Sequence, residues 1–254
     1  MPAAFSSLFG DPAAIRCERA VAELRSGRPV VITGDAQQRL AVIALDSATR
    51  RSFDAFAGLA AGRHYLFLTE TRARVLGMET PHGVRLPLQG VDFDALPSLG
   101  YLREPGPMPA DASAGDALDA GAVELARLGL LLPAMVGLPL DPADSRFEAA
   151  AQVALCDLAE GAAHAAHDYE LVARSPVPLR DIGMTTFAVF RGGVAQRDQV
   201  AIIVGQPDLA AVVPVRVHSS CLTGDLFGSL KCDGGDQLPR GLHKLKALGG
   251  GVLL

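Results

Sequence analysis

The sequence predicts an α/β protein in which helices and mixed sheets form two domains. In the first half of the chain, short runs rich in β-branched residues alternate with segments whose apolar residues recur at helical spacing. The composition changes at residues 174–178, and three more strand-like runs follow. Hydrophobic residues make up 49% of the chain and charged residues 20%, which is typical of a globular protein and not of a disordered one.

The first helix is predicted to begin just after Asp11. An aspartate can accept hydrogen bonds from the N–H groups of the first turn, and Pro12 has the backbone angle that suits the first helical residue. Apolar residues then follow at helical spacing from Ile15 to Leu24, and Gly27 ends the pattern.

Strands and a second helix are predicted to follow. Residues 30–33 and 41–45 are short runs rich in valine and isoleucine, with a polar loop between them. Ser47 is expected to cap a helix that Gly62 ends. Residues 65–68 form a third predicted strand, so strands and helices alternate as in a layered α/β domain.

The middle of the chain is less regular. Thr69 is expected to cap a short helix that ends near Gly77. Residues 79–116 are rich in Pro, Gly, Ala and Asp and are predicted to be mainly loops. Apolar spacing then predicts helices at residues 119–130 and from 146 to about 165.

The change in composition indicates where the domains divide. We expect a first domain at residues 1–165, a linker at 166–178 that contains two prolines, and a second domain at 179–254. Within the second domain we predict strands at 184–190, 199–204 and 212–217, a helix at 236–248 and a strand that begins at 251.

Charge and composition exclude several classes of protein. The net charge is −5 and no basic stripe is present, so nucleic acid is not expected as a partner. Residues 1–14 contain no Lys or Arg, so a signal peptide is not expected there. The apolar run at 125–140 is too short and too broken to span a membrane. Four cysteines at irregular spacing indicate no disulfide framework, so we expect a cytoplasmic protein in which Cys17 and Cys156 are small buried groups.

Residues 215–238 are the most informative segment. They combine a histidine, two cysteines, aspartates and a Thr-Gly turn, which suits a metal site beside a phosphate-bearing ligand better than a core. A catalytic zinc takes three protein ligands and leaves a fourth position for water. By spacing alone, Cys221 and Cys232 could equally be two buried thiols, His218 a hydrogen-bonded structural histidine and Arg216 a surface ion-pair residue.

This segment closely resembles the zinc and nucleotide segment of GTP cyclohydrolase II, whose pattern is Cys-x10-Cys-x-Cys. Cys221 and Cys232 match the first two zinc ligands, whereas Gly234 stands at the third. The resemblance implies that GTP is bound by Arg216, Val217, His218, Ser219, Ser220 and Gln237. Ser220 replaces the glutamate that the family usually has, and residues 223–225 match the turn between the ligands.

The resemblance implies a function in riboflavin biosynthesis. The family opens GTP by hydrolysis to a 2,5-diamino-pyrimidinone phosphate, with release of formate and pyrophosphate. Zn²⁺ is the implied catalytic cofactor, at a site that Gly234 leaves weak or incomplete, and Mg²⁺ is expected with the triphosphate. The resemblance covers about residues 171–254, and the family's later Glu-Gly-Arg segment and its catalytic Asp and Arg have no counterpart. We therefore expect a chain that is truncated within the cyclohydrolase domain and assign no catalytic residue.

Residues 15–140 resemble a distant 3,4-dihydroxy-2-butanone 4-phosphate synthase. The acidic magnesium loop of that family is here residues 34–40, with a single carboxylate, and its Gly-His-Thr-Glu signature is absent around residues 115–119. We therefore expect a structural or dimer-forming domain and a homodimer. His164 and His167 could share a helical face and bind metal, but a solvated pair is the simpler interpretation.

Two other functions remain open. The chain could be a non-catalytic module that binds a nucleotide or an oligomer partner, as Gly234 suggests. It could also be a related ring-opening enzyme that acts on another nucleotide.

Overall fold

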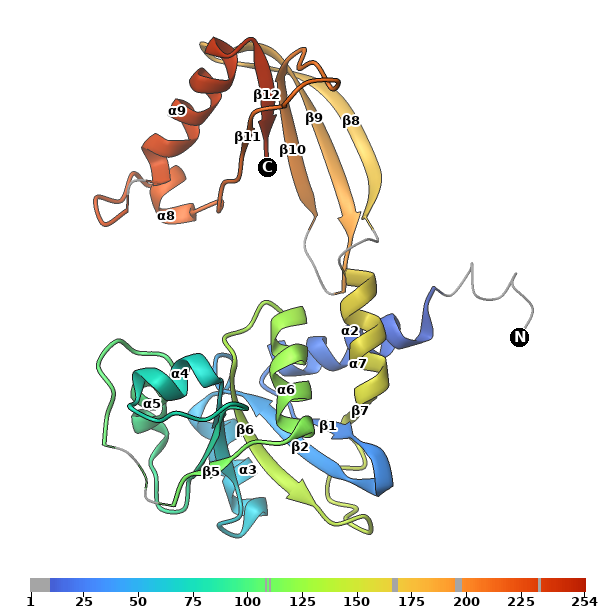
Figure 1. The fold of residues 1–254 in the computed structure, drawn as a ribbon, viewed down its shortest axis with the longest axis vertical. Helices are drawn as coiled ribbons and strands as arrows, with labels where there is room; N and C mark the ends of the chain where they lie inside the picture. The colour runs from blue at the N-terminus through green and yellow to red at the C-terminus, as the bar shows by residue number, and fades with distance from the viewer. Residues whose placement is uncertain (1–9, 108, 110, 166–168, 195–197, 233) are drawn as a thin grey trace, which may run out of the picture. The chain divides into compact units, whose positions relative to one another are not determined.

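A computed structural model describes residues 10–107, 109, 111–165, 169–194, 198–232 and 234–254 (Figure 1). The chain divides into two compact units. The first lies within Met1–His167 and adds the short segment that contains Val194, and the second comprises the other residues from Asp168 onward. Each unit has a mixed sheet with helices, so the predicted fold class is confirmed.

The first unit contains a seven-stranded sheet with the order β5-β4-β3-β6-β2-β1-β7. All neighbouring strands are antiparallel except β1 and β7, which are parallel. The strands are β1 (Val30–Thr33), β2 (Arg39–Ala44), β3 (Tyr65–Leu68), β4 (Val84–Pro87), β5 (Ser113–Ala114), β6 (Ala134–Leu140) and β7 (Ala151–Ala154). The strands predicted at 30–33 and 65–68 are confirmed, and the one at 41–45 begins two residues earlier.

Helices cover both faces of this sheet, so the unit has three layers (Figure 1). One face packs against α2, α6 and α7, and the other against α3, α4 and α5. In β1, the side chains of Val30 and Ile32 pack on the face that α2, α6 and α7 cover, and Val31 packs on the opposite face. All three are fully buried. The helices are α2 (Pro12–Arg25), α3 (Arg50–Ala60), α4 (Glu70–Val75), α5 (Leu96–Gly100), α6 (Ala117–Leu128) and α7 (Leu155–Ala165).

The caps of these helices confirm two of the three predictions. The Asp11 carboxylate accepts from the first-turn N–H groups of α2, and the Thr69 hydroxyl caps α4. The prediction for Ser47 is wrong, because Thr49 caps α3 in a capping box with Ser52. The Ser47 hydroxyl instead donates to the carbonyl oxygen of Leu24. The helix predicted at 119–130 is α6, whose cap is Asp116.

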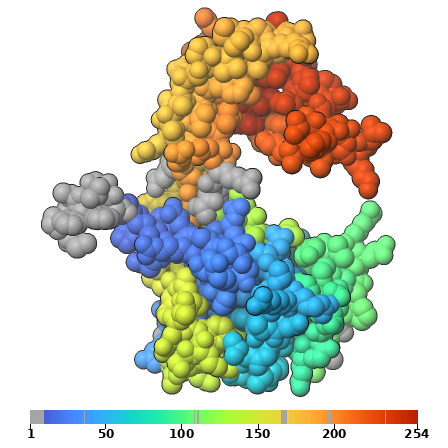
Figure 2. All heavy atoms as spheres, turned by 180° about the vertical axis from the view of Figure 1, so that it is seen from behind, coloured from blue at the N-terminus to red at the C-terminus, as the bar shows by residue number. Residues whose placement is uncertain are grey.

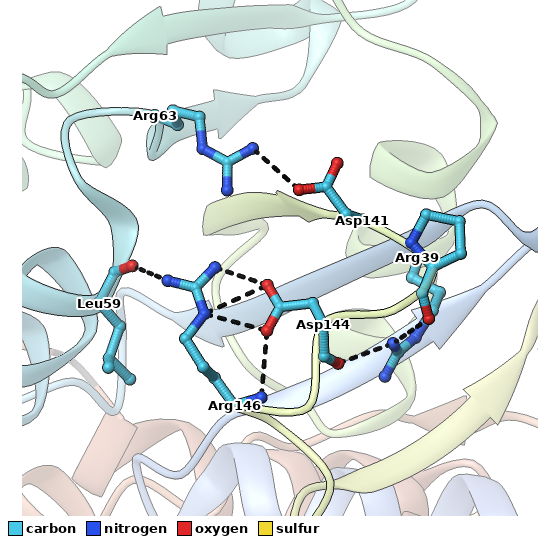
Figure 3. A network of polar contacts seen from close by, with 7 residues as sticks. Arg39, Leu59, Arg63, Asp141, Asp144 and Arg146 are labelled. Carbon is cyan, nitrogen blue, oxygen red and sulfur yellow. Dashed lines mark hydrogen bonds and ion pairs between the residues drawn. The ribbon is translucent and has the colours of Figure 1, made fainter.

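The helix predicted from residue 146 begins only at Leu155. Residues 151–154 form β7, which pairs with β1. The preceding loop is held by side chains instead of helical bonds (Figure 3). Arg146 is paired with Asp144 at 2.5 Å and donates to the carbonyl of Leu59, and Arg39 donates to the carbonyl of Asp144 at 3.0 Å. The loops expected at 79–116 likewise contain β4, α5, β5 and a short 3₁₀ turn at Phe93–Ala95.

The second unit contains a five-stranded sheet with the order β11-β12-β10-β9-β8. Its strands are β8 (Tyr169–Leu179), β9 (Gly183–Gly192), β10 (Gln199–Gly205), β11 (Val215–Arg216) and β12 (Gly250–Leu253). The residues 169–178, predicted as linker, are a strand, whereas 166–168 lie outside the described residues. Because β8 is the edge strand, Pro176 and Pro178 can occupy it without leaving the sheet short of a donor.

A single long helix packs on this sheet. Helix α9 (Gly234–Ala247) contributes Leu242 and Leu245 to a small core with Val204 and Leu253. The strand predicted from 251 is β12, which lies between β11 and β10, whereas the strand predicted at 212–217 shrinks to the two residues of β11. In the described parts of the chain, every helix is too short or too polar to cross a membrane.

Candidate functional site

The segment after β11 folds as two linked turns before α9. The Leu254 N–H donates to the Arg216 carbonyl at 2.8 Å, and the His218 N–H donates to the Leu254 carbonyl at 2.7 Å, so β12 holds the start of the segment. The short helix α8 (Leu222–Asp225) follows, and a loop leads from it to α9. The packing of β11 against β12 therefore fixes where the predicted site residues begin.

The two cysteines predicted as metal ligands lie side by side. Their Sγ atoms are 3.6 Å apart, although eleven positions separate them in the chain. Cys221 is also 3.4 Å from the Thr223 hydroxyl. The hydrogen bonds from Thr223, the Gly224 N–H and Cys232 together lower the pKa of Cys221. Both thiols are free, and a thiol whose pKa is lowered is a better ligand and nucleophile than an ordinary one.

Gly234 faces this pair. A Cβ atom at position 234 would lie 3.4 Å from the Cβ of Cys221 and 3.8 Å from the Sγ of Cys232, which are ordinary contacts. The position is thus well placed for a third donor but supplies none. Within the described residues, no three His, Cys, Asp or Glu side chains are grouped to hold a metal. Asp233, the other possible donor, lies outside the described residues.

His218 is paired with Asp225. Its Nε2 lies 2.8 Å from Asp225 Oδ2, and its side chain is only 6% exposed. The second oxygen of this carboxylate, Oδ1, is buried and has no hydrogen-bond partner among the described residues. It would lie 3.6 Å from a Cβ at Gly234. The one local sign of this pair in the amino-acid sequence is the Thr-Gly-Asp turn that contains Asp225.

Arg216 and Gln237 form a second contact within the predicted site. Arg216 Nη2 donates to Gln237 Oε1 at 2.5 Å, while its Nε is buried and unpartnered in the described structure. Both side chains line a cavity of about 540 Å³ between β11 and α9, together with Arg240 and Lys244. Cys232 lines a different cavity of about 480 Å³, bounded by Gly224, Lys231 and Asp236.

The remaining predicted contacts are exposed. Val217 is 73% exposed, and Ser219 and Ser220 are also at the surface. Ser220 has a positive φ of 51°, which places it in the left-handed region just before Cys221. The predicted residues therefore form three pairs or small groups along one segment and not one closed pocket.

The first unit has a buried polar network where the synthase signature was sought. Asp119, only 1% exposed, accepts from the Tyr65 hydroxyl at 2.7 Å and from Arg85 Nε at 2.6 Å. Asp116 is also paired with Arg85, at 2.5 Å. Burial raises the pKa of Tyr65, and the Asp119 carboxylate beside it acts in the same direction. Sequence reasoning missed this network, whose one local sign is the Asp116–Asp119 capping box.

The other candidate groups lie apart. Cys17 is buried, donates to the Asp157 carbonyl at 3.3 Å, and has its pKa raised to about 11 by burial. The prediction that Cys156 is buried is wrong, because it is exposed on α7. His164 lies 3.4 Å from the Asp11 carboxylate, and His167 lies outside the described residues.

Comparisons with known proteins agree with the motif. The family described as GTP cyclohydrolase II matches residues 170–254. A protein of Xylella fastidiosa (strain 9a5c) named GTP cyclohydrolase-2 is 58% identical over 248 residues, which is 97% of this chain and 62% of that protein. The chain thus spans less than two thirds of this relative's length.

A second relative is covered more completely. The protein of Azospirillum brasilense named GTP cyclohydrolase-2 is 35% identical over 262 residues, which is 96% of this chain and 68% of that protein. Among solved structures, a two domain 3,4-dihydroxy-2-butanone 4-phosphate synthase from A. baumannii is 16% identical with a TM-score of 0.45, over 94% of this chain and 81% of that one.

Proposed function

Because the chain belongs to the GTP cyclohydrolase II family, we propose that it is a GTP-binding protein of riboflavin biosynthesis. The family reaction hydrolyses GTP to 2,5-diamino-6-ribosylamino-pyrimidinone 5'-phosphate, formate and pyrophosphate. One observation carries the proposal. The Sγ atoms of Cys221 and Cys232 lie 3.6 Å apart, in the same part of the chain as the hydrogen-bonded pair of Arg216 and Gln237. Two thiols, a guanidinium and an amide on one short segment suit a metal and a nucleotide.

Arg216, Val217, His218, Ser219, Ser220 and Gln237 are the proposed contacts of GTP. The unpartnered Nε of Arg216 supports this role, because a buried guanidinium N–H without a partner is costly unless a ligand accepts from it. A guanidinium also matches phosphate oxygens better than an ammonium does. Gln237, which already accepts from Arg216, keeps its amide N–H groups to donate to a base.

The metal site is incomplete. A tetrahedral zinc with Zn–S bonds of about 2.3 Å separates its sulfur ligands by about 3.8 Å, and the Sγ atoms of Cys221 and Cys232 are 3.6 Å apart. The pair therefore fits two corners of a zinc site, but Gly234 leaves the third corner empty of protein donors. We propose weak Zn²⁺ binding, with Mg²⁺ carried by the triphosphate, and no reaction step through the metal follows from these residues.

A non-catalytic role is the second candidate. This role is favoured because, among the described residues, Cys221 and Cys232 have no third metal-ligating side chain grouped with them. In that case the segment would bind GTP without opening the ring. The first unit would then serve as a structural or dimer-forming module, and a homodimer is proposed in either case.

Formate release from GTP and GTP binding by calorimetry, measured on the same preparation, distinguish the two. Binding that Arg216→Ala weakens at least tenfold, with no formate above background, supports nucleotide binding without turnover. Formate that Cys221→Ser abolishes would support catalysis. Lys246→Ala is the matched control, because the Lys246 ammonium donates to the carbonyl of Asp181, which lies outside residues 215–238. The proposal fails if GTP neither binds nor reacts, or if Arg216→Ala changes nothing.

A further inference from the structure

The two thiols are held together by the backbone around them. The Asp225 N–H donates to the Cys221 carbonyl at 2.7 Å, and the Ser229 N–H donates to the Thr223 carbonyl at 2.9 Å. The Cys232 N–H donates to the Ser229 carbonyl at 3.4 Å, so successive hydrogen bonds link the two cysteines. The pair is therefore a product of the folded loop and not of two freely rotating side chains.

Glycines permit this approach. A Cβ at Gly224 would lie 2.7 Å from the Sγ of Cys232, closer than real contacts allow. A side chain at Gly235 would run into the carbonyl of Gly224. The absence of side chains at both positions lets the start of α9 pack against α8, and so brings Cys232 within reach of Cys221.

Solvent reaches the pair from one side. Cys232 is exposed and lines the cavity of about 480 Å³ described above, whereas Cys221 is half-buried. The loop next to the cavity stands out from the second unit in the orange-red part of Figure 2. Leu230, which lines the cavity, is fully exposed. A small oxidant can therefore reach Cys232 from the cavity.

We propose that Cys221 and Cys232 form a reversible intrachain disulfide in response to small-molecule disulfides. This inference is independent of GTP turnover, and rests on the mismatch between two thiols and a three-ligand metal site. In a complete site the metal would hold all its thiolates, but here Gly234 leaves the pair without a third partner. The thiolate is both the metal ligand and the nucleophile, so oxidation and metal binding exclude each other.

The chemistry balances without any further reagent. The Cys232 thiolate attacks one sulfur of the small disulfide and expels one thiolate, which leaves a mixed disulfide on Cys232. The Cys221 thiolate then attacks the Cys232 sulfur and expels the second thiolate. The protein loses two protons and two electrons, and the oxidant becomes two thiols. The Sγ atoms must close from 3.6 Å to about 2.05 Å.

The test uses oxidised glutathione on the chelator-treated full chain. Cys156→Ser is the background for all samples, because Cys156 is exposed on α7 and would react independently. Free thiols, counted after unfolding under acid quench, should fall from three to one per chain, with no glutathione retained. Non-reducing peptide mapping should join Cys221 to Cys232, and dithiothreitol should restore all three thiols.

Two further variants show that both thiols are needed. With Cys221→Ser the mixed disulfide on Cys232 has no second thiol to displace it, so one glutathione should stay bound. With Cys232→Ser the mixed disulfide can form only on Cys221, and one glutathione should again stay bound. An unchanged thiol count in the parent, a retained glutathione in the parent, or the same product from parent and Cys221→Ser would each overturn the proposal. The assay contains neither GTP nor metal, so its failure is distinct from failure of the proposed function.

Discussion

At position 234 a glycine faces two thiols that lie 3.6 Å apart. Its φ is not in the left-handed region, and a Cβ there meets only ordinary contacts, so a side chain would be tolerated. What the position lacks is a donor. Loss of one ligand matters because structural zinc sites draw about 10 kcal/mol or more from their complete ligand set.

Gly234→Cys should therefore raise zinc content and thermal stability together. The new side chain would begin from a Cβ that is 3.4 Å from Cys221 Cβ and 3.8 Å from Cys232 Sγ, so its sulfur would start beside the two thiols. Zinc per chain by atomic absorption and Tm with and without chelator are the measurements. Gly234→Ala, which adds the Cβ without the sulfur, should change neither. One tightly bound zinc per native chain, unaltered by the new cysteine, would show that another group already fills the position.

Asp119 is a second residue whose role depends on its surroundings. It is almost fully buried, and Tyr65, Arg85 and the Asp116 N–H all donate to it. Replacing it with alanine leaves the Tyr65 hydroxyl without its acceptor and the Arg85 guanidinium with Asp116 alone. We expect Asp119→Ala to lower the free energy of unfolding by about 3–5 kcal/mol, as when one partner of a buried ion pair is removed.

Urea denaturation of the two variants provides the measurement. Tyr65→Phe removes one hydrogen bond and should cost about 1 kcal/mol, because the Arg85–Asp119 pair stays intact. Equal losses for both variants, or less than about 1 kcal/mol for Asp119→Ala, would mean that water replaces the missing carboxylate and that the network is not tightly closed.

At the scale of elements, α7 is joined to α2 by an ion pair between facing helices. Arg16 donates to both oxygens of Asp157, at 2.8 and 2.6 Å. The hydrogen bond from Arg16 is the largest cause that lowers the pKa of Asp157, with a smaller contribution from the Ala154 N–H. The Ala154 contact also fixes the junction between β7 and α7.

Asp157→Asn should consequently destabilise the protein in a pH-dependent way. A carboxyl whose pKa is lowered in the folded state stabilises that state above the pKa of the unfolded chain, and this contribution is lost as pH falls through the folded pKa. The Tm of the variant should lie below that of the native protein at about pH 7, and the difference should shrink toward about pH 3. Asp46→Asn is the control, since it leaves this helix pair untouched. A difference that is constant with pH would mean that the effect is steric.

At the scale of the whole molecule, the chain contains two units that each have their own sheet and core. The first unit is the larger one, and a hydrophobic core lies on each face of its sheet. Its polar residues near 115–119 are bonded to one another and leave no open carboxylate cluster in the part of the unit that the structure describes.

We therefore expect no 3,4-dihydroxy-2-butanone 4-phosphate synthase activity. Magnesium requires several carboxylate oxygens in near-octahedral array, whereas Asp119 is occupied by Tyr65 and Arg85. Incubation with ribulose 5-phosphate and Mg²⁺ should yield no formate above a no-protein blank. Steady formation of formate and the butanone phosphate, lost on mutation of Asp35 in the 34–40 loop, would contradict this.

Local chemistry was enough to predict many elements. Asp11 and Thr69 cap their helices because a short oxygen-bearing side chain meets the first free N–H groups wherever the chain turns. The strands at 30–33 and 65–68 are runs of fully or largely buried β-formers. Each of these elements depends on residues close in sequence. The resemblance to the family, and not the spacing alone, indicated that Cys221 and Cys232 belong to one site, and their Sγ atoms lie 3.6 Å apart.

Tertiary structure decided the rest. Residues 151–154 become β7 because β1 offers a free edge to pair with, and residues 169–178 become an edge strand because β9 pairs with them despite two prolines. Thr49, and not Ser47, caps α3, because the Ser47 hydroxyl donates to the carbonyl of Leu24. The His218–Asp225 and Tyr65–Asp119–Arg85 contacts likewise join side chains whose proximity depends on folding. Sequence patterns report local bonds and periodicity, whereas partners distant in the chain are chosen only when sheets pair and burial makes an unpaired polar group costly.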